Sequence, residues 1–230
     1  MSAFADKVVN LATTDYPPYF AAQLPEDGAV AAITRAALAK QGYRLVLHYR
    51  PWARLMAEVR SGQYDGVMAV WFDDTRARYL AYSHPLVNSV IGFYGNRRKP
   101  IDVRSLATLR SYQIGTVSDY KNPDAFTAAH LQEVPADDDL TNLKKLAVGR
   151  LDLVLIDKVV ANHLLPSLPT RLSAELEWRD PPVATMPLYV GFSRARPETA
   201  ERLAAFNAGL ASLRKSGELK HIIQRFKLAQ

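Results

Sequence analysis

Hydrophobic and polar residues follow two periods along this chain, and the two periods predict strands and helices in alternation. Mostly apolar runs at 8–13, 64–70 and 151–156 indicate buried strands. Apolar residues at helical spacing predict a helix over 29–41, which Gly42 ends. This alternation is typical of parallel βαβ units, so we expect an α/β protein.

The same two periods predict further strands and helices in the rest of the chain. Further strands are expected at 44–49, 90–94, 112–117 and 188–192. Further helices are expected at 52–60, from Leu106, at 124–131, 140–148 and 161–165, from Pro197 to Gly217, and around 222–226.

Two of these strands predict the domain organisation. The segments 89–95 and 187–193 flank a stretch that has strands and helices of its own, and such a stretch can fold as an inserted lobe. We therefore predict two lobes joined by two crossing strands, a discontinuous lobe 1 of residues 1–93 and 189–230 and an inserted lobe 2 of residues 94–188.

Composition narrows the class of protein. The 230 residues are 48% hydrophobic and 23% charged, which is typical of a globular chain, and no run of about 18 apolar residues predicts a membrane span. The net charge is +6, but residues 94–188 hold 12 basic and 12 acidic groups, so the excess lies on lobe 1. Because the basic residues are dispersed and no nucleic-acid-binding signature occurs, we expect no nucleic-acid partner.

Several chemistries are absent from the sequence. There is no cysteine, which excludes disulfides and thiolate metal ligands, and the five histidines are scattered singly. No metalloprotease, nucleophile-elbow, phosphate-loop or dinucleotide motif occurs, so we expect no metal and no cofactor. At the N-terminus, Ala3-Phe4-Ala5 fits the small-x-small pattern of signal peptidase, and we interpret residues 1–5 as the remnant of an export signal.

Two aromatic residues are candidates for ligand binding. Tyr16 lies in the aromatic turn 15–20 directly after the first strand, and Trp52 opens a helix just beyond another strand. Ligands of open α/β sheets bind at the carboxyl ends of the strands, where aromatic rings offer flat apolar faces. For Tyr19 and Phe20 in the same turn we expect packing against the core instead.

Charged residues supply a second set of candidates. Arg76 could bind a carboxylate through two parallel hydrogen bonds, or could pair with Asp73 or Asp74 at the surface. Asp157 ends the buried run 151–156, and a carboxylate there needs a cation, which a ligand ammonium could supply. The alternatives are pairing with Lys158 or a role as an exposed helix cap.

A series of motifs in order resembles a known family. They are Tyr16-x-Pro-Tyr19, Trp52, Ser61-Gly62-x-x-Asp65-Gly66, Thr75-Arg76, Tyr82-Ser83-x-Pro85, Gly149-Arg150-x-Asp152 and Ile156-Asp157. Over nearly the whole chain this pattern resembles the periplasmic solute-binding proteins of family 3, the amino-acid type. The resemblance implies a two-lobed periplasmic-binding-protein fold of type II, in which each lobe is a mostly parallel sheet flanked by helices and the lobes close on a small ligand.

The resemblance also implies roles for individual residues. Tyr16 and Trp52 correspond to two aromatic residues that sandwich the ligand side chain. Arg76 corresponds to the arginine that binds the α-carboxylate, and Asp157 to the aspartate that receives the α-ammonium.

The sequence departs from the family pattern in two of the segments that carry candidate residues. Trp71 and Phe72 replace small residues, and we expect Trp71 to fill or reshape the pocket. In lobe 2 the usual carboxylate-binding turn is replaced by Ser118, Asp119, Tyr120 and Lys121. Ser118 and Tyr120 remain ligand-binding candidates, because a helix start there could receive an anion, although Asp119 would oppose it.

The resulting expectation is a non-catalytic periplasmic protein that binds an amino acid or related carboxylate. It would act as a monomer and deliver this ligand to the membrane permease of an ABC transporter. One alternative is a sensor module that presents its ligand to a membrane receptor. The other is an enzyme similar to cyclohexadienyl dehydratase on the same fold, with Asp157, Asp119 or Lys121 as acid or base.

Overall fold

A computed structural model describes residues 7–118 and 120–228 of the chain. Residues 1–5, interpreted above as the remnant of an export signal, and Asp119 lie outside the described residues. The chain divides into two compact units, unit 1 of Met1–Asn88 and Pro187–Gln230 and unit 2 of Ser89–Met186. Both boundaries lie inside strands, β5 (Asn88–Asn96) and β9 (Leu176–Ser193). The sequence-based boundaries, 93/94 and 188/189, fall within the same two strands.

Unit 1 is built on a mostly parallel sheet. Strand β1 (Lys7–Thr13) lies between β2 (Tyr43–Tyr49) and β3 (Gly66–Trp71) and pairs with both in parallel, while β9 pairs antiparallel with β3. The short strand β4 (Leu80–Tyr82) also pairs with β9. Its helices are η1 (Pro25–Asp27), α1 (Ala29–Ala39), α2 (Trp52–Arg60), α3 (Asp74–Ala77), α8 (Thr199–Ser216) and α9 (Glu218–Arg225).

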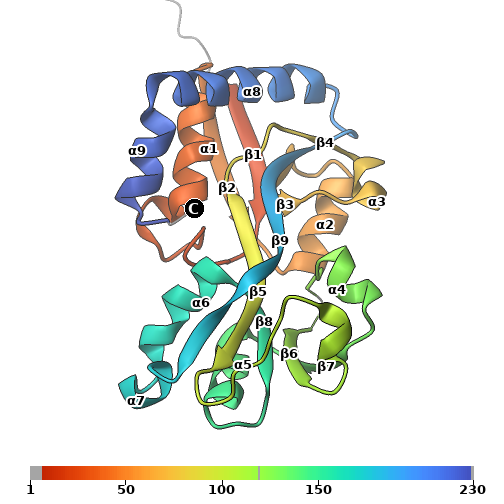
Figure 1. The fold of residues 1–230 in the computed structure, drawn as a ribbon. Helices are drawn as coiled ribbons and strands as arrows, with labels where there is room; N and C mark the ends of the chain where they lie inside the picture. The colour runs from red at the N-terminus through yellow and green to blue at the C-terminus, as the bar shows by residue number, and fades with distance from the viewer. Residues whose placement is uncertain (1–6, 119, 229–230) are drawn as a thin grey trace, which may run out of the picture. The chain divides into compact units, whose positions relative to one another are not determined.

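The helices of unit 1 cover its sheet from two sides. Figure 1 shows α1 and α9 on one side of the strands and α2 on the other. Helices α1 and α8 approach very closely at Gly209, where an added Cβ would lie 1.9 Å from the carbonyl oxygen of Ala37. The core includes Phe192 of β9 against Phe206 of α8, both fully buried, with ring centroids 6.0 Å apart.

Unit 2 repeats this arrangement on a smaller scale. Strand β6 (Gln113–Val117) pairs in parallel with β7 (Gln132–Ala136) and with β8 (Leu153–Asp157), and β5 pairs antiparallel with β8. The helices are η2 (Leu106–Leu109), α4 (Asp124–Ala128), α5 (Asp139–Ala147), α6 (Lys158–Leu164), η3 (Leu165–Ser167) and α7 (Thr170–Ser173). Each unit therefore has its own mixed sheet, and the predicted α/β class and two-lobed type II fold are confirmed.

Some elements differ from the sequence prediction for clear reasons. The helix 52–60 is confirmed as α2, whereas α1 ends at Ala39, and Gly42, with a φ of +74°, lies in the turn that follows it. Strand β7 is missed, because it contains Pro135 and is largely exposed, so it shows no apolar run. The first half of β9 is missed for a similar reason, since it carries Pro181 and Pro182.

Because the strands within each unit are mostly parallel, their carboxyl ends meet at one edge of the sheet. In unit 1, β1, β2 and β3 end at Thr13, Tyr49 and Trp71. In unit 2, β6, β7 and β8 end at Val117, Ala136 and Asp157. The segments that follow these ends carry nearly all of the candidate residues.

Candidate functional site

Tyr16 sits in a tight turn that the core holds in place. Its N–H donates to the carbonyl oxygen of Phe20 at 2.7 Å, and its own carbonyl accepts hydrogen bonds from the N–H groups of Tyr19 and Phe20 at 3.0 and 3.1 Å. Tyr19 and Phe20 are buried, which confirms that they pack in the core. The half-buried Tyr16 ring stacks on the ring of Tyr19, with ring centroids 5.6 Å apart. The buried Tyr19 ring therefore limits the orientations that the Tyr16 ring can adopt.

Trp52 and Arg76 are brought together although they are 24 positions apart in the sequence. Trp52 is the first residue of α2 and packs on a cluster that includes Leu55 and Val59. The Arg76 Cζ lies 5.3 Å from the centroid of the Trp52 ring, which is within the range of a cation–π contact. No hydrogen bond or ion pair joins the Arg76 guanidinium to any residue in the described part of the chain. Its N–H donors are therefore available to a carboxylate.

The backbone around Arg76 is fixed by a helix cap. The Asp73 side chain accepts hydrogen bonds from the N–H groups of Thr75 and Arg76 at 3.0 and 3.1 Å, and so begins the one-turn helix α3. Asp73 thus serves the backbone of Arg76, whereas the guanidinium turns toward Trp52. Pairing of Arg76 with Asp73 or Asp74 is thus not seen among the described residues, and carboxylate binding by Arg76 stays a prediction.

Trp71 ends β3, shortly before Arg76 in the sequence. The residue is half-buried, and its indole Nε1 is buried with no hydrogen-bond partner among the described residues. The β3–β9 register shifts between Val67 and Val70, and Ala69 has a φ of +62°, so a bulge reorients the end of the strand. The departure from the family pattern at Trp71 therefore coincides with an irregular strand end.

The turn that contains Ser118 and Tyr120 differs from the expected helix start. The Ser118 N–H donates to the carbonyl oxygen of Ala136 at 2.9 Å, and the Tyr120 N–H to that of Val117 at 3.4 Å. Helix α4 begins only at Asp124. The prediction of a helix start at 118–120 is therefore wrong, and the amides of Ser118 and Tyr120 are already bonded, whereas ligand binding by these two residues stays a prediction.

Asp157 is a buried helix cap at the end of β8. It is 2% exposed, and its Oδ1 accepts hydrogen bonds from the N–H groups of Val159 and Val160 at 2.7 and 3.0 Å. Its Oδ2 accepts a hydrogen bond from the Ser89 hydroxyl. The neighbouring Lys158 extends its ammonium over the Trp178 ring, 4.9 Å from the centroid. Asp157 is therefore a cap, as one alternative held, but it is buried rather than exposed.

Sequence reasoning missed Asp139 at the same edge of unit 2. This first residue of α5 is only 8% exposed. Burial, with the nearby carboxylates of Asp157 and Asp138, raises the pKa of Asp139 to about 7. Partial burial, with Asp139 and Asp138, also raises the pKa of Tyr120 to about 12. The available signal was the Asp137-Asp138-Asp139 triplet between a strand and a helix, where a single acidic cap would suffice.

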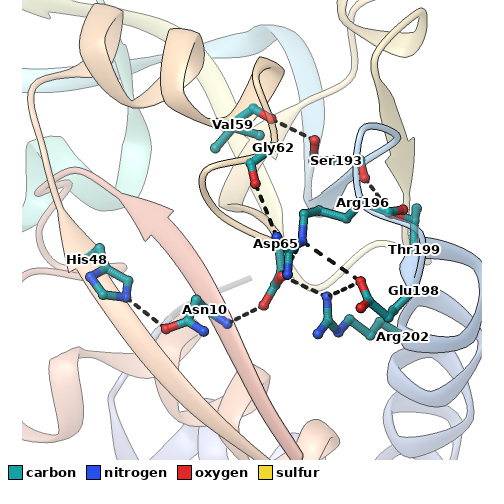
Figure 2. A network of polar contacts seen from close by, with 10 residues as sticks. All are labelled: Asn10, His48, Val59, Gly62, Asp65, Ser193, Arg196, Glu198, Thr199 and Arg202. Carbon is teal, nitrogen blue, oxygen red and sulfur yellow. Dashed lines mark hydrogen bonds and ion pairs between the residues drawn. The ribbon is translucent and has the colours of Figure 1, made fainter.

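A separate polar network holds unit 1 together away from these residues (Figure 2). Asp65 is 3% exposed, and its Oδ1 lies 2.7 Å from Nη1 of Arg202 and 3.1 Å from Nε of Arg196. Its Oδ2 accepts a hydrogen bond from the N–H of Asn10 at 2.8 Å. Asp65 thus orders the connection into β3, and it also joins that connection to α8 and β1.

Metal-binding clusters and membrane-spanning helices are both absent from the described residues. Over 7–118 and 120–228, no cluster of three or more His, Cys, Asp or Glu side chains could hold a metal ion. Within the same ranges, none of the helices is long and apolar enough to pass through a membrane.

Comparison with known proteins identifies the family. The sequence model of the bacterial extracellular solute-binding proteins, family 3, matches residues 9–229, and the chain therefore belongs to this family. The resemblance found in the sequence is thus confirmed. No protein of curated function matches the chain by sequence.

Solved structures show the same fold at low sequence identity. The GluR0 ligand-binding core in complex with L-glutamate is 15% identical, with a TM-score of 0.80 and coverage of 96% of this chain and 99% of that one. A histidine kinase sensor domain is 22% identical, with a TM-score of 0.75 and coverage of 95% of each chain. An amino acid ABC transporter substrate-binding protein from Streptococcus pneumoniae, bound to L-arginine, is 17% identical, with a TM-score of 0.74 and coverage of 96% and 94%.

Proposed function

We propose that this solute-binding protein binds an amino acid or a closely related small carboxylate without catalysis, and that it delivers this ligand to an ABC transporter. In unit 1 the ligand would be bound by Tyr16, Trp52, Trp71 and Arg76. In unit 2 it would be bound by Ser118, Tyr120 and Asp157. Membership of the family and the amino-acid ligands named for two similar structures support this proposal.

The observation that carries the proposal is the state of Arg76. Its guanidinium is placed against the Trp52 ring, and its N–H donors are not used by the described residues. A guanidinium binds a carboxylate through two parallel hydrogen bonds, and a bound carboxylate would also neutralise its charge. Binding to both units would stabilise a closed form only through contacts that the open form lacks, and hinged closure is therefore part of the proposal.

The test is a binding measurement on two variants, each of which changes one of two nearby arginines. The 20 standard amino acids are first screened by thermal shift, and the strongest of them is then titrated by calorimetry. We expect Arg76→Ala to weaken its binding by about 100-fold or more, because the ligand carboxylate loses its charged partner. Arg78→Ala is the control, since Arg78 is exposed and follows the same helix. Equal affinities of wild type and Arg76→Ala would contradict the assignment.

A second function is favoured by one comparison. The similar histidine kinase sensor domain shows that this fold also occurs in a signalling protein. A permease and an ATPase encoded beside this gene would support uptake. A receptor kinase or a cyclase in that place would support a sensor role.

The absence of catalysis is also part of the proposal and has its own test. Incubation of the protein with prephenate or arogenate should give no product. Turnover that is lost in Asp157→Asn would replace the binding proposal by an enzyme similar to cyclohexadienyl dehydratase.

The family is extracellular, and we propose that the mature chain is periplasmic after removal of an export signal. Expression of the full-length gene and mass spectrometry of the periplasmic fraction would give the mature N-terminus. We expect it near Asp6.

A further inference from the structure

Asp139 is a buried residue whose carboxyl group accepts no hydrogen bond from the described residues. The residue opens α5 directly after β7 and is 8% exposed. Its neighbour Asp138, not Asp139, caps the helix by accepting a hydrogen bond from the N–H of Thr141 at 2.7 Å. The Asp139 carboxyl group makes no hydrogen bond with the described residues. This side chain therefore has no role in the helix cap.

The groups that face Asp139 from the neighbouring elements are acidic or neutral. The Asp157 carboxylate at the end of β8 and the Tyr120 hydroxyl after β6 both interact with it electrostatically, as does Asp138. The two lysines that follow Tyr120 and Asp157 in the sequence make contacts of their own, since Lys158 lies over the Trp178 ring and Lys121 lies 3.9 Å from Asp124. This edge of unit 2 therefore holds two buried acidic residues, Asp139 and Asp157, and the charges that act on Asp139 are those of Asp157 and Asp138.

A second buried acceptor lies one turn further along the same helix. Asn142 is 0% exposed and donates from Nδ2 to the carbonyl oxygen of Thr116 at 2.8 Å, which leaves its Oδ1 buried and without a hydrogen-bond partner in the described structure. Residues three apart lie on the same face of a helix, so Asp139 and Asn142 share the face directed toward β6. Buried acceptors thus exceed donors here, which is the opposite of what an anion-binding edge requires.

A buried, unpaired carboxyl group costs stability, and such groups are retained where a ligand supplies the missing charge. The neighbouring turn fits this interpretation, because the amides of Ser118 and Tyr120 are already bonded and cannot receive a carboxylate. A ligand that meets this edge would be stabilised by positive charge and by N–H donors. An ammonium group supplies both, with three donors.

We propose that Asp139 is a second ligand-binding carboxylate of unit 2, that it shares with Asp157 the binding of a cationic nitrogen of the solute, and that the solute is a basic amino acid or a diamine. This proposal rests on the proposed function of solute binding and names the class of solute. It assigns Asp157 and Asp139 to a common cationic group, in place of a single α-ammonium contact by Asp157 alone.

The experiment compares four probes on the full chain by calorimetry at pH 8. The probes are L-lysine, L-arginine, 1,4-diaminobutane and L-glutamate. The variant is Asp139→Asn, which keeps the shape of the side chain and removes its charge. The control is Asp137→Asn, which makes the same change in charge two positions away at an exposed residue. Thermal unfolding of each variant confirms that it is folded.

We expect at least one of the three cationic probes to bind more tightly than L-glutamate. Asp139→Asn should weaken that binding by about tenfold or more, and Asp137→Asn by less than about twofold. Repeating the titration at pH 6, where Asp139 is mostly protonated, in two buffers with different ionisation enthalpies should show proton release on binding to wild type and none for Asp139→Asn. A purely structural role of Asp139 would not produce this difference between buffers.

The outcomes separate this inference from the proposed function. Tight binding of L-glutamate that is unaffected by Asp139→Asn would overturn the inference and leave amino-acid binding intact. Binding of the diamine alone would support the inference and contradict an amino-acid ligand. No binding of any probe would overturn the inference, and the screen of the 20 amino acids would then decide the proposed function separately.

Discussion

Arg202 of α8 donates a hydrogen bond from Nη1 to Oδ1 of Asp65 at 2.7 Å, and this contact joins residues 137 positions apart. Asp65 lies immediately before β3, and its Oδ2 also holds the N–H of Asn10 in β1. The carboxylate therefore fastens the last long helix of the chain to two strands formed near its beginning.

The first prediction concerns the loss of this carboxylate. Asp65→Ala leaves Arg202 partly buried, with Glu198 at 3.3 Å as its remaining ion-pair partner among the described residues. We expect a loss of about 3 kcal/mol or more in the free energy of unfolding, because removal of one partner from a buried ion pair uncovers a buried charge. Urea unfolding followed by circular dichroism measures it, with exposed Asp74→Ala as control. A change in Asp65→Ala as small as in the control would show that the network is not stabilising.

The second prediction concerns the contact between α1 and α8. In Gly209→Ala the new methyl group would meet the carbonyl group of Ala37, which is backbone and cannot move aside as a side chain could. We expect a loss of about 1–3 kcal/mol in the free energy of unfolding despite the higher helix propensity of alanine. The comparison is Ser212→Ala on the exposed side of the same helix. A stabilised Gly209→Ala would mean that the helices separate at little cost.

The third prediction concerns the support that Trp52 gives to Arg76. A cation–π contact contributes about 0.5–2 kcal/mol, so Trp52→Ala should weaken binding of the best amino-acid probe by about 3-fold to 30-fold. Trp52→Phe keeps an aromatic face and should lose less. Calorimetry gives the affinities, and thermal unfolding corrects for lost packing, since Trp52 also contacts the core. If alanine and phenylalanine bind equally well, the ring has no part in the site.

The fourth prediction concerns the pH dependence of stability without ligand. Burial and neighbouring carboxylates raise the pKa of Asp139 from its ordinary 3.8 to about 7, so between these values the folded chain keeps a proton that the unfolded chain has lost. The contribution of Asp139 is therefore most favourable below pH 4, declines as pH rises to 7, and is constant above it.

Asp139→Asn removes this dependence. Relative to wild type it should be nearly neutral at pH 4 and more stable at pH 8, by an amount bounded at a few kcal/mol, since one pKa unit corresponds to about 1.4 kcal/mol. Denaturant unfolding at both pH values measures the difference, and Asp137→Asn shows the effect of charge alone. Equal differences at pH 4 and pH 8 would contradict the raised pKa.

Local sequence signals determined much of the fold. The apolar spacing that predicted helix 52–60 produced α2, and the turn after α1 contains Gly42, which adopts a positive φ without strain. Strand β7 and the first half of β9 gave no such signal. Prolines interrupt both segments, and the side chains of both segments are mostly exposed or half-buried. Their strand conformation therefore depends on pairing with neighbouring strands rather than on an apolar pattern.

For the candidate residues, too, some features follow from the sequence and others only from the tertiary structure. The sequence by itself determined the family, the alternation of strands and helices, and the positions of Tyr16, Trp52, Arg76 and Asp157 after strand ends, because these depend on neighbours along the chain. Only the tertiary structure decided that Arg76 lies against Trp52 and that Asp139 is buried near Asp157. Distance and desolvation set those interactions, and both arise when segments far apart in the sequence pack together.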